Sequence, residues 1–140
     1  MTTPNQNQQL PVGDAAEFAE QRISFSRLHA DTAAAVQLAN VKIPRGSAFV
    51  AQLVYAKNDV DTGESITRQE ITGGNPDGTL VINAESAVTD DLSAAPTNDL
   101  AVTAAVNGDL LEVGIATNSG GSDVGISGYI AITQVSIVNG

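Results

Sequence analysis

The sequence predicts an all-β protein with a β-sandwich or jelly-roll-like domain, and three observations predict it. Small and β-branched side chains carry the 42% hydrophobic content of the 140-residue chain, whereas aromatic residues make up only 4%. Such side chains favour pleated, half-buried surfaces. Alternating apolar segments are separated by turn-forming residues about every ten residues, which is typical of short strands in a sandwich. At this length we expect one domain with a sizeable core.

The N-terminal residues 1–13 differ from the rest of the chain. They are polar, rich in Gln and Asn, and contain two prolines, so we expect an extended, flexible arm. Residues 14–140 are then expected to form the single β-sandwich domain. Asp14 and Glu17 have the spacing of a capping box, which predicts at most a short helix ending near Gln21. The N-terminus lacks the basic and apolar regions of a secretory signal, so we expect no export by that route.

Three consecutive segments are predicted to be strands. Ile23–Leu28 alternates as a strand does. Asp31–Ala39 fits either a helix or a strand, and we interpret it as a strand because Val41–Gly46 looks like a strand that ends in a turn. Ser47–Ala56 is the strongest core segment. Since it carries apolar residues on both faces, it is predicted to be an interior strand.

The second half of the chain is predicted to be strands joined by polar turns. Residues 66–72 and 79–84 are expected to pair as a hairpin around the turn at 73–78. Residues 85–99 are interpreted as a long surface connection. The last strand is predicted at Gly128–Val138, where Ile and Val are dense.

The pair Asn107–Gly108 gives the clearest local signal. Both residues tolerate a positive φ, as a two-residue type I′ hairpin turn requires. This turn pairs Val106 with Asp109, Ala104 with Leu111, Val102 with Val113, and Leu100 with Ile115. From the second pair onward, one face of the hairpin is apolar on both strands, which supports this register.

The charge distribution limits the possible partners. The net charge is −10, and all six basic residues lie between Arg22 and Arg68. We therefore expect neither a nucleic acid nor a membrane as partner, because nucleic acids and anionic membranes bind basic surfaces. In addition, no segment approaches the roughly 18 apolar residues of a membrane span. The asymmetry indicates either a self-repelling soluble surface or two halves that meet different neighbours, with Arg22 or Arg27 acting in an assembly. The absence of cysteine excludes disulfides and thiol catalysis.

Two segments contain residues suited to acid–base or metal chemistry. His29 lies two residues from Asp31, but a single histidine near a strand end is more often a surface or hydrogen-bonded structural residue. Asp59–Gly63 resembles the start of an EF-hand loop. Its glycine stands at the fifth position instead of the sixth, so a plain β-turn is favoured and calcium binding stays open.

Two further segments are weaker candidates for chemistry. Gly120–Gly125 lacks the lysine of a phosphate-binding loop. Asp90 and Asp91 are adjacent, and on an extended chain their carboxylates point apart. We therefore assign no catalytic, cofactor-binding or metal-binding residue, expect no cofactor, and predict that the chain is not an enzyme.

The polar arm Met1–Gly13, the stretch Val41–Ser47 and the Thr/Val/Gly-rich C-terminal half resemble small bacteriophage virion proteins, especially head decoration (cement) proteins. The resemblance implies a homotrimeric structural protein on the outer surface of the capsid, with an extended segment that reaches across neighbouring subunits. Its partner would be the major capsid protein or another virion protein, and its location the virion, assembled in the host cytoplasm.

The alternative function is a receptor- or glycan-binding module of the fibre or carbohydrate-binding type. Such a module needs an exposed aromatic side chain or a calcium-ordered loop. The only tyrosines are Tyr55 and Tyr129, and their apolar neighbours predict that both lie in the core. A hydrolase with His29 as its base is a third, weaker hypothesis.

Overall fold

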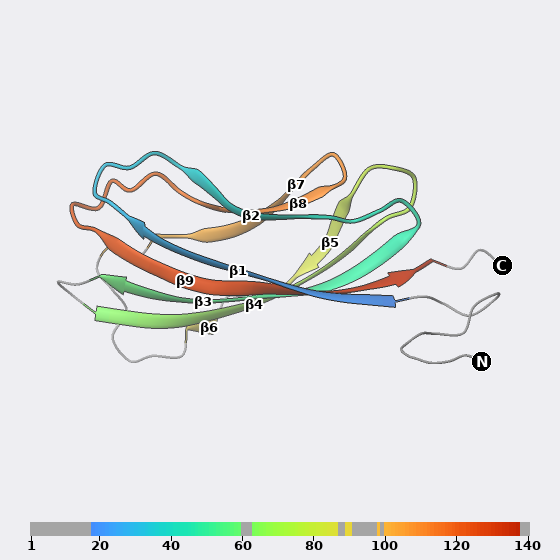
Figure 1. Ribbon diagram of the computed structural model, residues 1–140, viewed down its shortest axis with the longest axis horizontal. Coiled ribbons are helices and arrows are strands. Elements are labelled where there is room, and N and C mark those ends of the chain that lie inside the picture. The colour runs from blue at the N-terminus through green and yellow to red at the C-terminus, as the bar shows by residue number, and fades with distance from the viewer. Residues whose placement is uncertain (1–17, 60–62, 87–88, 91–97, 99, 138–140) are drawn as a thin grey trace.

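Two antiparallel sheets lie face to face in the computed structural model of the chain (Figure 1), which describes residues 18–59, 63–86, 89–90, 98 and 100–137. No helix occurs among these residues. The strands are β1 (Phe18–His29), β2 (Val36–Lys42), β3 (Ser47–Asp59), β4 (Gly63–Asn75), β5 (Val81–Glu85), β6 (Thr89–Asp90), β7 (Val102–Asn107), β8 (Leu110–Ile115) and β9 (Val124–Ser136). The predicted all-β sandwich is confirmed. The predicted arm, residues 1–13, lies outside the described residues.

The larger sheet has the strand order β1-β9-β3-β4-β5, and β6 also pairs with β4. The smaller sheet has the order β2-β8-β7. Strand β3 is central because it pairs along all thirteen residues with both β4 and β9. Its side chains alternate regularly, and every second residue from Ser47 to Asp59 is buried. The predicted interior strand is therefore confirmed.

The core lies between the two sheets and consists mainly of aliphatic side chains. The large sheet contributes Phe49, Leu53, Tyr55, Ile71, Ile130 and Ile132, and the small sheet contributes Val41, Leu111, Val113 and Ile115. Ile43, in the turn after β2, is also fully buried. Burial of branched aliphatic side chains between two sheets supplies most of the stabilisation of such a fold.

Strand β1 corrects the N-terminal prediction. Its twelve residues pair with β9 without interruption, from Phe18 opposite Val135 to His29 opposite Val124. Residues 18–21 are thus extended, and the helix predicted to reach Gln21 is wrong over these residues. The ladder with β9 determines their conformation, because tertiary pairing overrides a local capping signal.

The strand predicted over Asp31–Ala39 is confirmed only from Val36, where β2 begins; residues 31–35 form a turn and an irregular segment, with a positive φ of 67° at Thr32. The alternation within β2 is interrupted. The register with β8 shifts between Gln37 and Ala39, as at a β-bulge. Leu38 is half-buried, and Ala39 and Val41 then point into the core. The bulge adds one residue to β2 and so exchanges its faces.

The β7–β8 hairpin is confirmed, but the predicted register is wrong by two residues. Asn107 pairs with Leu110, so Gly108 and Asp109 form the loop. Only Gly108 has a positive φ, +63°, whereas a type I′ turn needs two such residues. Because the shift is even, the same side chains still face the core.

The remaining strand predictions are partly corrected. The hairpin of β4 and β5 is confirmed, with Thr72 opposite Ala84. The segment 85–99 contains the short strand β6, which pairs with Thr67 and Arg68 of β4. Strand β9 begins at Val124, four residues before the predicted start, and residue 138 lies outside the described residues.

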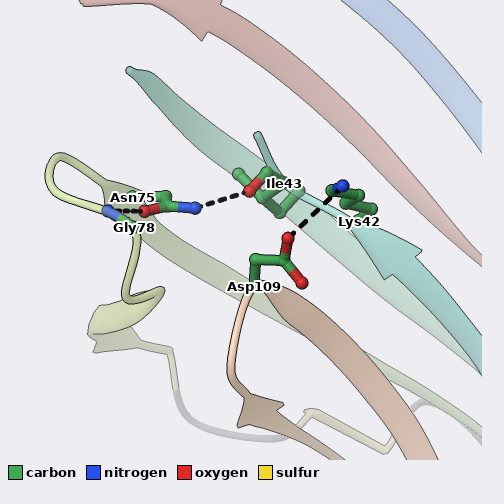
Figure 2. A network of polar contacts seen from close by, with 5 residues as sticks. All are labelled: Lys42, Ile43, Asn75, Gly78 and Asp109. Atoms are coloured by element: carbon green, nitrogen blue, oxygen red, sulfur yellow. Dashed lines mark hydrogen bonds and ion pairs between the residues drawn. The ribbon is translucent and has the colours of Figure 1, made fainter. Parts of the chain in front are cut away.

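A buried amide joins the loops at one end of the sandwich (Figure 2). The Asn75 side chain, at the end of β4, donates to the Ile43 carbonyl at 2.8 Å and accepts from the Gly78 amide at 2.8 Å. Beside it, Lys42 and Asp109 form an ion pair at 3.5 Å. The Asp109 carbonyl also accepts from the Ile43 amide at 2.9 Å. These contacts fix the β7–β8 loop against both neighbouring turns.

We expect Gly128→Ala to destabilise the fold by about 3 kcal/mol, because the site is already filled. Gly128 lies opposite Phe25 and Tyr55 in the sheet. An added Cβ would lie 2.6 Å from Tyr55 Cα and would collide with the Val54 carbonyl. Denaturant unfolding measures the change. The matched control is Gly125→Ala on the same strand, where the nearest atom lies at 3.8 Å; equal effects of the two variants would contradict this account.

Candidate functional site

The candidate site is the outer face, which we define as the surface of β1, β9, β3 and β4 that points away from the small sheet. It carries the even-numbered residues of β1, β3 and β4 and the odd-numbered residues of β9. Apart from Gly74, none of these residues with a described side chain is buried, and no described strand packs across them. No described element therefore covers the outer face.

In-register pairing arranges the side chains of the outer face in rows across four strands. One row consists of Arg22, Ala131, Gln52 and Glu70. The next row consists of Ser24, Tyr129, Val54 and Arg68. Most other positions carry small residues; Leu28, Val50 and Val135, at 63%, 44% and 41% exposure, are large apolar exceptions. The central rows thus combine charged, aromatic and small side chains.

Tyr129 corrects a sequence prediction. It is half-buried on the outer face, because the alternation of β9 sends its neighbour Ile130 into the core. Tyr55, by contrast, is 4% exposed and lies in the core as predicted. The guanidinium of Arg22 lies 4.3 Å from the centre of the Tyr129 ring, a cation–π contact.

Tyr129 also lines a shallow hollow of about 380 Å³ on the β4 side of the outer face. Its other lining residues are polar or small: Gln52, Val54, Arg68, Gln69, Glu70 and Ser86. Amide, guanidinium, carboxylate and hydroxyl groups can form hydrogen bonds with a polar ligand. In the hollow, an aromatic side chain and such groups converge.

The basic residues do not form one patch. Arg22 and Arg68 share the outer face with three acidic residues, Glu20, Glu64 and Glu70. Lys57 is buried between the sheets, and Lys42 pairs with Asp109 at the opposite end of the fold from His29. The outer face is therefore close to neutral, although the chain as a whole carries a charge of −10.

His29 has both ring nitrogens engaged. It is fully buried; its Nδ1 accepts from Arg27 Nε at 3.0 Å, and its Nε2–H donates to the Ala116 carbonyl at 2.9 Å. The donor-only Arg27 and the acceptor-only carbonyl require this tautomer. The Asp31 amide instead donates to the Asp123 carboxylate at 2.8 Å. His29 thus has a structural, hydrogen-bonded position.

A second buried amide lies near His29, and sequence reasoning missed it. The fully buried Asn118 side chain donates to the carbonyls of His29 at 2.9 Å, Ala30 at 3.1 Å and Ser122 at 2.8 Å. Its oxygen accepts from Asn98 Nδ2 at 2.9 Å and the Gly120 amide at 3.2 Å. The signal in the sequence was an asparagine at the start of a Gly-rich loop.

The candidate calcium segment Asp59–Gly63 is described only at its ends. Asp59 is buried, and its Oδ2 accepts from the backbone amide of Asn98 at 3.3 Å and from Ser122 Oγ at 3.0 Å. Within the described part of the chain, no three His, Asp or Glu side chains are placed to hold a metal ion together.

The remaining candidates also lie in structural contacts. In the Gly120–Gly125 loop, the side-chain amide of Asn98 fills the space beside Gly120. Asp90, in β6, pairs with Thr67 of β4, and Asp91 lies outside the described residues. The described residues include no helix long and apolar enough to cross a membrane.

No protein-family model and no curated protein matches the chain. Among solved structures, it is similar to the tailspike protein gp49 of Acinetobacter baumannii bacteriophage Fri1, a capsular polysaccharide depolymerase, with 13% identity and a TM-score of 0.44, over 88% of this chain and 18% of that chain. The Acinetobacter baumannii phage AM24 tailspike protein is similar with 10% identity and a TM-score of 0.43, over 89% and 27%. The chain spans less than a third of either tailspike.

We expect Asn118→Ala to destabilise the fold by about 3 kcal/mol or more, because it leaves several buried polar groups without partners. The midpoint of guanidinium unfolding measures this loss. Asn40→Ala is the matched control, since Asn40 is exposed and its amide donates only to Gln37, at 2.8 Å. Its effect should stay within about 0.5 kcal/mol. A comparably small loss for Asn118→Ala would contradict the role of this amide.

Proposed function

We propose that this chain is a non-enzymatic virion structural protein that decorates and stabilises a bacteriophage capsid. It binds the outer surface of the shell through residues 1–13 and its β-domain, and its partner is the major capsid protein or another virion protein. Its location is the virion, assembled in the host cytoplasm. The observation that carries the proposal is the outer face, a broad sheet surface that no described strand covers, built mostly from small side chains and suited to contact with a virion protein or with another copy of the chain.

The composition of the outer face suits contact with a protein. A sheet surface of Ala, Ser, Thr and Val side chains offers many contacts to a second protein surface and little depth for a small molecule. Its charges nearly balance, whereas nucleic acid would need a basic surface. The polar, proline-containing residues 1–13 suit a segment that orders on a partner and covers a large area.

Many copies on a symmetric shell would make weak individual contacts sufficient. Association among copies adds binding sites, and linked sites raise the effective concentration of each contact. The resemblance to head decoration proteins implies a homotrimer; the proposal itself requires only that copies associate. A decorating layer needs rigidity, which the uninterrupted ladders of β1, β9 and β3 provide.

A second function is favoured by one observation, the position of Tyr129. Its partly exposed ring and the polar side chains around the hollow are the elements of a glycan- or receptor-binding site. Against it, Arg22 already lies over the ring at 4.3 Å, so one stacking face is occupied. We therefore place glycan binding second.

We expect deletion of residues 1–13 to leave the circular dichroism spectrum unchanged and to weaken binding to capsids. The described strands begin at Phe18, so the deletion removes none of the residues in the described ladders. Co-sedimentation with capsids of the phage that encodes the chain measures binding. A control with residues 2–13 in scrambled order separates the arm's sequence from its length. Undiminished binding of the deletion variant would exclude the arm's role, and no binding of the full chain would exclude decoration.

On a glycan array we expect no binding above background. The variant Tyr129→Ala, compared with the full chain, makes this test specific to the hollow. Glycan binding by the full chain that Tyr129→Ala abolishes would instead support the second function. Binding that the variant retains would place a glycan site elsewhere on the molecule.

A further inference from the structure

We propose that the outer face is a two-fold interface between two copies of this chain, in which Arg22 of each copy pairs with Glu70 of the partner subunit. This inference deepens the association of copies within the proposed function and rests on that part of it. It assigns the surface and the symmetry, with two copies in place of the three that the resemblance implies.

The register of the sheet places these charges for a two-fold pairing. Arg22 on β1 and Glu70 on β4 are the two ends of one row across the outer face. Consider a two-fold axis that runs parallel to the strands, midway between β9 and β3 and between two facing sheets. It places β1 over β4 of the partner subunit, and so Arg22 over Glu70 of the partner subunit. The same operation repeats the pair on the other side of the axis, as an isologous interface requires.

Neither charge has an ion-pair partner among the described residues. Arg22 contacts the Tyr129 ring, and the ion pair of Lys42 with Asp109 involves neither Arg22 nor Glu70. The backbone of Glu70 bonds with Ser86, and no hydrogen bond of its carboxylate is recorded in the described part of the chain. Two exposed, opposite charges at matching distances from one axis are complementary to a second copy.

The neighbouring row fills the centre of the same interface. Tyr129 on β9 would lie against Val54 of the partner subunit on β3, and the small Ala131 against Gln52 of the partner subunit. Aromatic side chains are enriched at the centre of protein interfaces, and charged residues at the rim. This arrangement puts Tyr129 near the axis and Arg22 and Glu70 toward the rim.

The dimensions also fit. Twelve residues of β1 extend about 40 Å, and four strands are about 19 Å wide, so the face covers roughly 750 Å². A standard interface buries about 800 Å² per partner. Packed sheets cross at about 30°. For a side chain that lies about 7 Å from the axis, this crossing causes a displacement of about 4 Å relative to its partner. The Arg22 and Glu70 side chains are long enough to cover that shift.

Light scattering after size exclusion tests this arrangement on the full chain. We expect a mass near twice 14.3 kDa for the natural sequence. Arg22→Glu and Glu70→Arg should each raise the dissociation constant at least tenfold, because each sets like charges opposite each other twice per dimer. The double variant R22E/E70R should restore the dimer, since the pair is re-formed with reversed signs. Circular dichroism checks that every variant is folded.

The matched control is Glu112→Arg, which reverses a charge on the opposite surface of the sandwich, on β8, and should leave the mass unchanged. A monomer or a trimer of the natural sequence would overturn the proposal, and so would single variants that still dimerise or a double variant that does not. Capsid co-sedimentation of the same variants reports separately on decoration, so failure of the interface and failure of the proposed function remain distinct.

Discussion

Two buried asparagine side chains hold the ends of this sandwich closed. Asn75 and Asn118 are both fully buried and lie at opposite ends of the central strand β3, near Ser47 and Asp59 respectively. Each amide both donates to and accepts from the backbone of the turns around it. A sandwich without helices or disulfides must satisfy these loop groups within the protein, because a buried polar group without a partner costs about 1–3 kcal/mol.

The closed ends allow long, regular strands between them. Because the loops are fixed at both ends, β3, β4 and β9 each continue for thirteen residues with paired neighbours. The core needs only one side of these strands, so the other side is left as a surface whose side chains are held in rows by the ladder. The outer face is thus a consequence of how the fold is stabilised.

The sequence predicted what depends on local periodicity and little of what depends on distant contacts. Alternation identified β3 as an interior strand, and turn residues located the β7–β8 hairpin. The register of that hairpin was wrong because asparagine and glycine at 107 and 108 allow two loops that face the same side chains inward. The extent of β1 depends on pairing with β9, and burial of Asn118 depends on groups 88 and 89 residues away. Strand alternation alone also does not say which face of β9 is covered, so Tyr129 was misplaced.

The contact between Arg22 and Tyr129 bears on both proposed uses of the outer face. A guanidinium stacked on a ring has lost much of its rotamer freedom before a partner arrives, so less entropy is lost when it pairs with a carboxylate. The same stacking occupies a ring face that a sugar would need. It therefore favours pairing of Arg22 with Glu70 of the partner subunit and disfavours a glycan at Tyr129. A two-fold pair would in turn bury the hollow, so a layer of such dimers would bind the shell through surfaces other than the outer face.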